Sequence, residues 1–365
     1  MSQPRIGGRR AAPPRPTLLV GDLAACQAAF GRLQQRVLEL SLAQHAALEA
    51  GDQDGAAADA WRDLVPRCRA LRETLTSLRE LSHFTREVYE CAADVCARAG
   101  DLGEALKALQ VLVHHIYPAL AAAEAAAGPA GAGTYEQPGS RPPGLQRQQQ
   151  PEQAAPAAGQ SPRRAGGGGW RGGDEEEAAE DAWLVGPSTQ LDSPTVAAAL
   201  QQPAFRRWPE VAGALVLYFT AARPAGAPAG NAQLDTLATL RRLPPPLLRA
   251  AEVRAALRLR AALAAGDYVA LFRLREGAPP LVRALVSGSV AAAARERALV
   301  VLAVAYRNIA VAAVCRTLAL DTPRLLLACL KLLADRGHAA AGRALSGLQQ
   351  EEAAALPAAD VVFKG

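Results

Sequence analysis

The chain has 365 residues and a formal net charge of +5; half of its residues are hydrophobic but only 4% are aromatic. The apolar content is therefore mostly Ala, Leu and Val, and this composition favours an all-α protein because Ala and Leu are strong helix formers. No apolar run reaches the roughly 18 residues that a membrane span requires, and no hydrophobic signal-peptide segment follows Met1. Six Cys spread over so long a chain are typical of reduced intracellular thiols rather than of a disulfide framework.

The first part of the chain reads as a tail followed by helices. Residues 1–20 are rich in Arg and Pro and predict a disordered tail, with an organelle transit peptide as the alternative. Residues 21–127 carry apolar residues at roughly helical spacing. Within them, Gly100-Asp101 predicts a tight turn between two helices. Gly can adopt the left-handed conformation at a helix C-terminus, and Asp can cap the helix that follows.

The middle of the chain changes composition sharply. Residues 128–190 contain Gly166–Gly169, Gln148–Gln150, many Pro and an acidic run from Asp174 to Glu177. Such a segment buries too little apolar surface to order itself, so we expect a disordered, low-complexity insertion.

Residues 191–290 return to helical patterning. Gly266-Asp267 repeats the Gly-Asp turn of the first part, which indicates a stack of TPR-like helical hairpins. No fixed sequence period of a strict repeat family accompanies it. The helices expected here are Pro209–Ala222, Asn231–Leu243, Leu247–Ala265 and Tyr268–Arg275.

The last part, residues 291–365, predicts three short helices and a terminal strand. The helices are Ala292–Tyr306, Val311–Leu320 and Thr322–Arg336, and the strand lies near Asp360–Phe363. Thr322 and Pro323 form a good helix start, with Thr as the cap and Pro in the first turn. Three helices followed by a strand is the order of a winged helix, here with a short wing.

Catalytic and metal-binding signatures are absent from the sequence. His114 and His115 are adjacent and would point about 100° apart on a helix, so the pair cannot share a metal ion without a third element. Cys91 and Cys96 are spaced too widely for a zinc pair. An enzyme would need a pocket that gathers His114, Cys91 or Asp94 with shifted pKa values. We therefore predict no catalytic residue, metal site, cofactor or small-molecule substrate.

Positive charge is concentrated between Arg241 and Arg336, where the sequence contains sixteen Lys and Arg residues but only six Asp and Glu residues. A basic helical surface of this kind can neutralise phosphates of RNA or DNA. The alternative interpretation is a plain solvated surface in a chain whose cations are almost all Arg. The candidate nucleic-acid contacts are Arg254, Arg258, Arg295, Arg297, Arg324 and Lys331.

Several sequence runs, taken in order, resemble the SAC-three/GANP family. The matching runs are Leu71–Thr76, Phe84–Glu90, Gly100-Asp101, Ala256–Arg260, Gly266–Tyr268, Phe272–Leu274, Ala278-Pro279, Arg295–Leu299 and Ala305–Arg307. The chain lacks the Cys-Pro-x-Met-Cys-Pro segment of nuclear-pore members, which favours the branch that includes leukocyte-receptor-cluster member eight. The motif residues expected to serve packing are Phe84, Tyr89, Gly100, Asp101, Gly266, Asp267, Tyr268, Phe272 and Tyr306.

The resemblance implies a PCI domain, in which helical hairpins end in a winged helix. It further implies a non-enzymatic scaffold of a nuclear complex for mRNA processing or export. The scaffold would pair with a second PCI protein, and the paired winged helices would touch RNA or DNA. A subunit of the proteasome regulatory-particle lid, which shares this fold and uses the winged helix for assembly alone, is the alternative.

Overall fold

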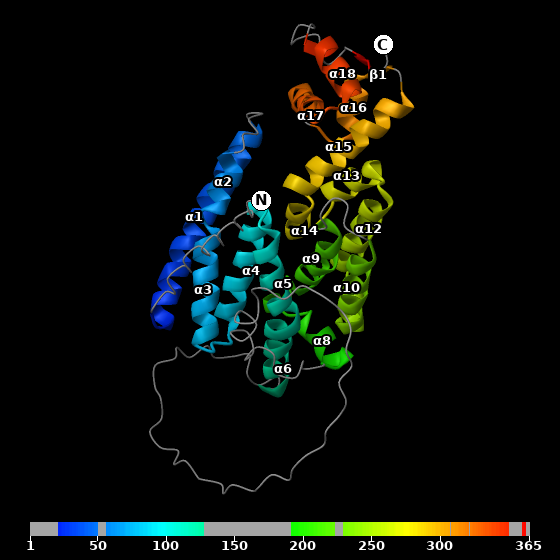
Figure 1. Ribbon diagram of the computed structural model, residues 1–365. Coiled ribbons are helices and arrows are strands. Elements are labelled where there is room, and N and C mark those ends of the chain that lie inside the picture. Colours follow the sequence, from blue (N-terminus) through cyan, green and yellow to red (C-terminus); the bar gives the residue numbers. More distant parts are fainter. Residues whose placement is uncertain are drawn as a thin grey trace, which may run out of the picture.

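A computed structural model describes residues 21–49, 56–127, 191–222, 229–306, 308–320, 322–349 and 360–362. These residues are mostly helical, as the composition predicts, with two short strands near the C-terminal end. The helices form an elongated stack that runs from α1–α3 at one side to α15–α18 at the far end (Figure 1). The predicted tail at 1–20 and the predicted insertion at 128–190 lie outside the described residues.

The part of the chain before residue 128 folds into helices that surround α4. Helix α4 packs against α2, α3 and α5, and its buried residues include Val88, Ala92 and Val95. The elements in chain order are α1 (Leu23–Glu49), α2 (Ala56–Arg62), α3 (Val65–Ser77), α4 (His83–Ala99), α5 (Leu102–Val111), the π-helical segment η1 (Leu112–Ile116) and α6 (Tyr117–Ala127).

The part from residue 191 to 285 is built around α9 and α12. Helix α9 contacts α10, α12 and α14, and it also contacts α5 of the first part, while α14 contacts α4. The two parts therefore form one packed body. Its elements are α8 (Ser193–Ala199), η3 (Pro203–Phe205), α9 (Trp208–Ala221), α10 (Ala229–Arg242), α11 (Pro245–Arg249), α12 (Ala251–Ala265), α13 (Tyr268–Glu276) and α14 (Pro280–Leu285).

The last part places a small helical group beside a two-stranded antiparallel sheet. Strands β1 and β2 pair with Ile309 opposite Val361. Helix α17 contacts α15, α16 and α18, and α18 contacts β2. The elements are α15 (Gly288–Ala305), β1 (Asn308–Ala310), α16 (Val311–Thr317), α17 (Pro323–Asp335), α18 (Ala339–Gln349) and β2 (Asp360–Val362).

Both Gly-Asp turns have the predicted conformation. Gly100 and Gly266 follow α4 and α12 with φ values of 74° and 69°. Asp101 accepts a hydrogen bond from the N–H of Glu104, and Asp267 accepts one from the N–H of Ala270. Each Gly adopts the left-handed conformation that ends a helix, and each Asp caps the helix that follows, so both hairpins turn as the sequence predicts.

Close approach fixes the pairing of α9 with α12. Most of α9 is buried on every side, which is typical of a helix at the centre of a core. A Cβ atom placed on Gly213 would lie 3.0 Å from the backbone oxygen of Glu252 and 3.2 Å from the Cβ of Ala256. Only Gly at this position lets the two helices pack at their observed distance.

Several predicted boundaries were wrong. The helix expected over Leu247–Ala265 is two helices, α11 and α12, because Ala250 adopts an extended conformation between them. Thr322 precedes α17 with Pro323 in the first turn, but the Thr322 hydroxyl accepts no capping hydrogen bond. Strand β1 and helix α18 were not predicted at all.

Candidate nucleic-acid interface and buried polar network

Helix α12 exposes two of the candidate arginines on one face. Arg254 and Arg258 are one helical turn apart and both are exposed, whereas Val253, Ala256 and Leu259 are buried against the core. Neither arginine forms an ion pair within the described part of the chain. Both guanidinium groups are therefore free to contact an anionic partner.

Helices α15 and α17 expose three further candidates. Arg297 on α15 is exposed, and its Nε donates to the carbonyl of Ala293 in its own helix. Arg324 and Lys331 are exposed two turns apart on one face of α17. None of the three forms an ion pair with another described residue. With Arg254 and Arg258 they form what we call the basic set, five exposed cations distributed over α12, α15 and α17.

Arg295 is the exception among the six candidates, and the prediction that it contacts nucleic acid is not favoured by its position. Its Nε donates to the carbonyl of Leu318 (3.1 Å) and its Nη2 to that of Ala319 (2.9 Å). Its guanidinium also lies 5.2 Å from the ring centroid of Phe272. Arg295 therefore satisfies the carbonyls at the end of α16 and joins α13, α15 and α16.

The aromatic motif residues differ in burial. Tyr89 and Phe272 are buried, and the Tyr89 hydroxyl lies 3.0 Å from Thr76 Oγ1. Phe84 packs edge-on against Phe30 at a centroid distance of 5.6 Å. Tyr268 is half-buried, and Tyr306 is 49% exposed, so the packing role expected of Tyr306 is at most partial.

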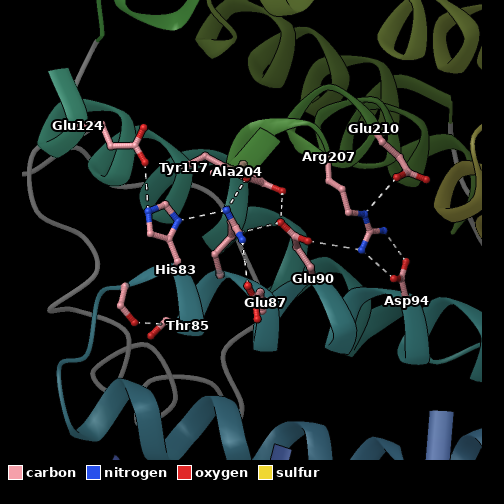
Figure 2. A network of polar contacts seen from close by, with 12 residues as sticks. His83, Thr85, Glu87, Glu90, Asp94, Tyr117, Glu124, Ala204, Arg207 and Glu210 are labelled. Carbon is pink, nitrogen blue, oxygen red and sulfur yellow. Dashed lines mark hydrogen bonds and ion pairs between the residues drawn. The ribbon is translucent and has the colours of Figure 1, made fainter. Parts of the chain in front are cut away.

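A polar network that the sequence did not predict lies where α4 meets α6, η3 and α9 (Figure 2). At its centre is Glu90, a buried residue whose Oε1 accepts a 2.7 Å hydrogen bond from the Tyr117 hydroxyl. Arg86 Nε lies 3.3 Å from the same oxygen, an ion pair without hydrogen-bond geometry, and Arg207 Nη1 lies 3.6 Å from Oε2. Burial raises the pKa of Glu90, although the Tyr117 hydroxyl and the two arginines oppose this shift.

Arg207 connects the network to the part of the chain from residue 191 to 285. It donates two hydrogen bonds to Asp94, of 2.9 and 2.8 Å, and a third to Glu210 (3.3 Å). Glu210 in turn accepts a 2.7 Å hydrogen bond from the N–H of Leu281 at the start of α14. Bidentate pairing of this kind fixes orientation as well as charge, so Arg207 joins α4, α9 and α14.

The other end of the network ties η3 to α4 and α6. Arg86 donates to the carbonyl of Ala204 and lies 3.2 Å from His83 Nδ1, while His83 Nε2 lies 3.1 Å from Glu124. The ring of Tyr117 stacks on Trp208 at 5.3 Å with an interplanar angle of 12°. These contacts join segments that flank residues 128–190, so we assign the network an architectural role.

Of the three residues named for an enzymatic pocket, Cys91 and Asp94 lie one turn apart on α4, and His114 lies in η1. Asp94 is bound by Arg207, and His114 in η1 forms no hydrogen bond or ion pair to Asp94 or Cys91 in the described structure. Burial raises the pKa of Cys91 to about 12, which keeps its thiol protonated at neutral pH. Burial and the nearby charge of Arg242 lower the pKa of His114 to about 4. Among the described residues no group of three or more His, Cys, Asp or Glu could hold a metal ion.

Comparisons with models of protein families, with curated proteins and with solved structures find no match to this chain. No helix in the described ranges is long and apolar enough to cross a membrane.

Proposed function

We propose that the protein is a non-enzymatic PCI-type scaffold of a nuclear mRNA-processing or export complex. In this proposal it pairs with a second PCI protein and contacts RNA through the basic set. The support comes from the sequence runs described above and from the architecture. Helical hairpins with Gly-Asp turns lead into the three predicted helices, α15, α16 and α17, with β1 after α15 and the additional helix α18 before β2. That order of elements is compatible with a winged helix.

The observation that carries the proposal is the exposure of the basic set. Five cations present their side chains to solvent on α12, α15 and α17 without ion pairs in the described chain. Unpaired exposed cations can release counterions from a nucleic-acid backbone, which makes RNA affinity strongly dependent on salt. No acid of the described chain neutralises them, so their charge remains available to phosphates.

Purification of the tagged full-length protein from nuclear extract tests the assignment. The proposal predicts recovery of a PCI-domain partner together with mRNA-processing factors, in amounts that do not fall after nuclease treatment. Recovery of proteasome ATPases instead would contradict it and would indicate the lid-subunit alternative.

A further inference from the structure

An apolar groove of about 300 Å³ lies between α15, α17 and the first turn of α18. Its walls include Leu299 and Ala303 from α15 and Leu330 and Leu333 from α17. This volume is about twice that of a cavity of ~150 Å³ that holds a benzene molecule. The groove can therefore accept several aliphatic carbons of a partner's side chains.

The apolar surface continues from the groove onto the outside of α15. Val300 and Val304 line the groove and are 36% and 72% exposed, and Val301 beside them is 52% exposed. Exposed aliphatic residues one turn apart, next to a groove, are typical of a surface that receives an apolar helix or segment. Apart from Gly337 and His338 the lining is aliphatic, so the groove offers bases a single imidazole ring and no Phe, Tyr or Trp on which to stack.

The charges around the groove decide between possible occupants. Arg297 is exposed one turn before Val300 and Val301, and Arg336 is next in the chain to Gly337, which lines the groove. Glu296 is paired with Arg336. Asp335 is exposed on α17, and Lys331 and Arg343 are exposed on α17 and α18, so cations outnumber acids among the described residues of this region.

The end of the groove formed by the first turn of α18 is also electrostatically positive. Its lining includes Ala339, Ala340 and Ala341, the first turn of α18, whose N–H groups donate to no acceptor among the described residues. These groups carry the partial positive charge of a helix N-terminus. They add to the charge of Arg297 and would not attract a basic segment.

We infer that this groove binds a short amphipathic segment of a partner protein in which aliphatic residues alternate with Asp or Glu. The aliphatic side chains enter between α15 and α17, and the acidic ones face Arg297 and the start of α18. This inference goes beyond the proposed RNA-binding scaffold. Arg297 belongs to both surfaces, but the aliphatic lining of the groove is not part of the basic set, so a peptide and an RNA probe distinguish the two.

The test uses the full-length protein and a fluorescein-labelled helical peptide with Leu at i, i+3, i+4 and i+7 and Glu elsewhere. A second peptide has Lys in place of every Glu, and an oligouridylate serves as the nucleic-acid probe. Binding is measured by fluorescence anisotropy. We expect saturable binding of the Glu peptide and at least tenfold weaker binding of the Lys peptide.

Variants locate the binding to the groove. Val304→Asn removes an apolar wall and Ala303→Phe fills the groove, and we expect each to weaken the Glu peptide by roughly tenfold. Val269→Asn is the matched control, since Val269 is an exposed Val of α13 that does not line the groove or the surface beside it, and it should change binding by less than about twofold. Thermal unfolding of each variant confirms that it is folded.

Three results would overturn the inference. These are the absence of saturable Glu-peptide binding, equal effects of Val304→Asn and Val269→Asn, and weakening of oligouridylate rather than peptide by Val304→Asn. The last result would assign the groove to nucleic acid. Loss of oligouridylate binding on reversal of Arg254 and Arg258, with peptide binding intact, would leave the inference standing and concern only the proposed function.

Discussion

The junction of α4 with α9 and the group α15–α18 are held together by different forces. Ion pairs of Arg207 with Glu90 and Asp94 join α4 to the start of α9, and Tyr117 of α6 stacks on Trp208 of α9. The interior of the α15–α18 group is aliphatic, and the side chains of Arg295 and Arg336 form hydrogen bonds between its elements. The difference indicates a division of labour. The charged side chains of the first region stabilise the junction between helices, whereas most of those of the second region remain exposed on the surface.

Removal of Arg207 should have the largest effect on stability. Arg207→Ala leaves Asp94 without its bidentate partner and the buried Glu90 with one cation fewer. We expect a loss of about 2–4 kcal/mol in the free energy of unfolding, measured by urea denaturation. Arg206→Ala, an exposed neighbour, is the control and should stay within about 0.5 kcal/mol of wild type. A small loss for Arg207→Ala would mean that the network contributes little to the junction.

Acidification should weaken the first region through His114. Its pKa is lowered to about 4 in the folded protein, so between pH 6.5 and 4 the unfolded chain binds a proton that the folded chain does not. Above pH 6.5 this group does not lower the free energy of unfolding. As the pH falls from 6.5 to 4, the free energy of unfolding decreases by about 2–3 kcal/mol because of His114. His114→Gln should flatten this part of the pH profile. A profile unchanged by His114→Gln would contradict the assignment.

Substitution at the contact of α9 with α12 should destabilise the protein less than the changes at Arg207 and His114. Gly213→Ala places a Cβ 3.0 Å from the Glu252 oxygen, and the helices must separate slightly to accept it. We expect a loss of about 1–2 kcal/mol in thermal or urea unfolding. Gly31→Ala in α1 meets no atom within 4 Å and should instead stabilise the protein by about 0.5–1 kcal/mol. Stabilisation by both changes would show that α9 and α12 do not need this close approach.

Cleavage of the chain within 128–190 should have the smallest effect. Contacts of Arg86 with Ala204, of Arg207 with Asp94 and of α6 with α8 join the segments on either side of it. After cleavage at one inserted protease site, the two fragments should elute together in gel filtration. They should also unfold in a single transition at a midpoint close to that of the intact protein. Separation of the fragments would contradict the packing of the two parts.

The sequence predicted the features that depend on local interactions. Gly100-Asp101 and Gly266-Asp267 were recognisable because a turn and a cap need only neighbouring residues. The exposed arginines of α12 followed from helical periodicity, but the role of Arg295 did not, because its carbonyl partners lie 23 and 24 residues further along the chain.

The buried network could not have been predicted from the sequence. Arg207 and Asp94 are 113 residues apart, and residues 128–190 lie between them, so no spacing rule connects them. A partial signal existed, since Glu90 lies among strongly apolar positions of a helix, where an acid needs a partner. Strand β1 was missed because its three residues are too few to show an alternating pattern.

Salt-dependent RNA binding by paired variants tests the division of labour most directly. The full-length protein, the charge-reversal variant Arg254→Glu/Arg258→Glu/Arg297→Glu and Arg207→Ala are titrated with oligouridylate at several salt concentrations, below the unfolding midpoint of each. The charge-reversal variant should lose RNA binding and its salt dependence while it keeps its unfolding midpoint. Arg207→Ala should unfold more readily yet bind RNA as the wild type does. RNA binding that survives charge reversal, or that fails in folded Arg207→Ala, would contradict the separation of architecture from binding.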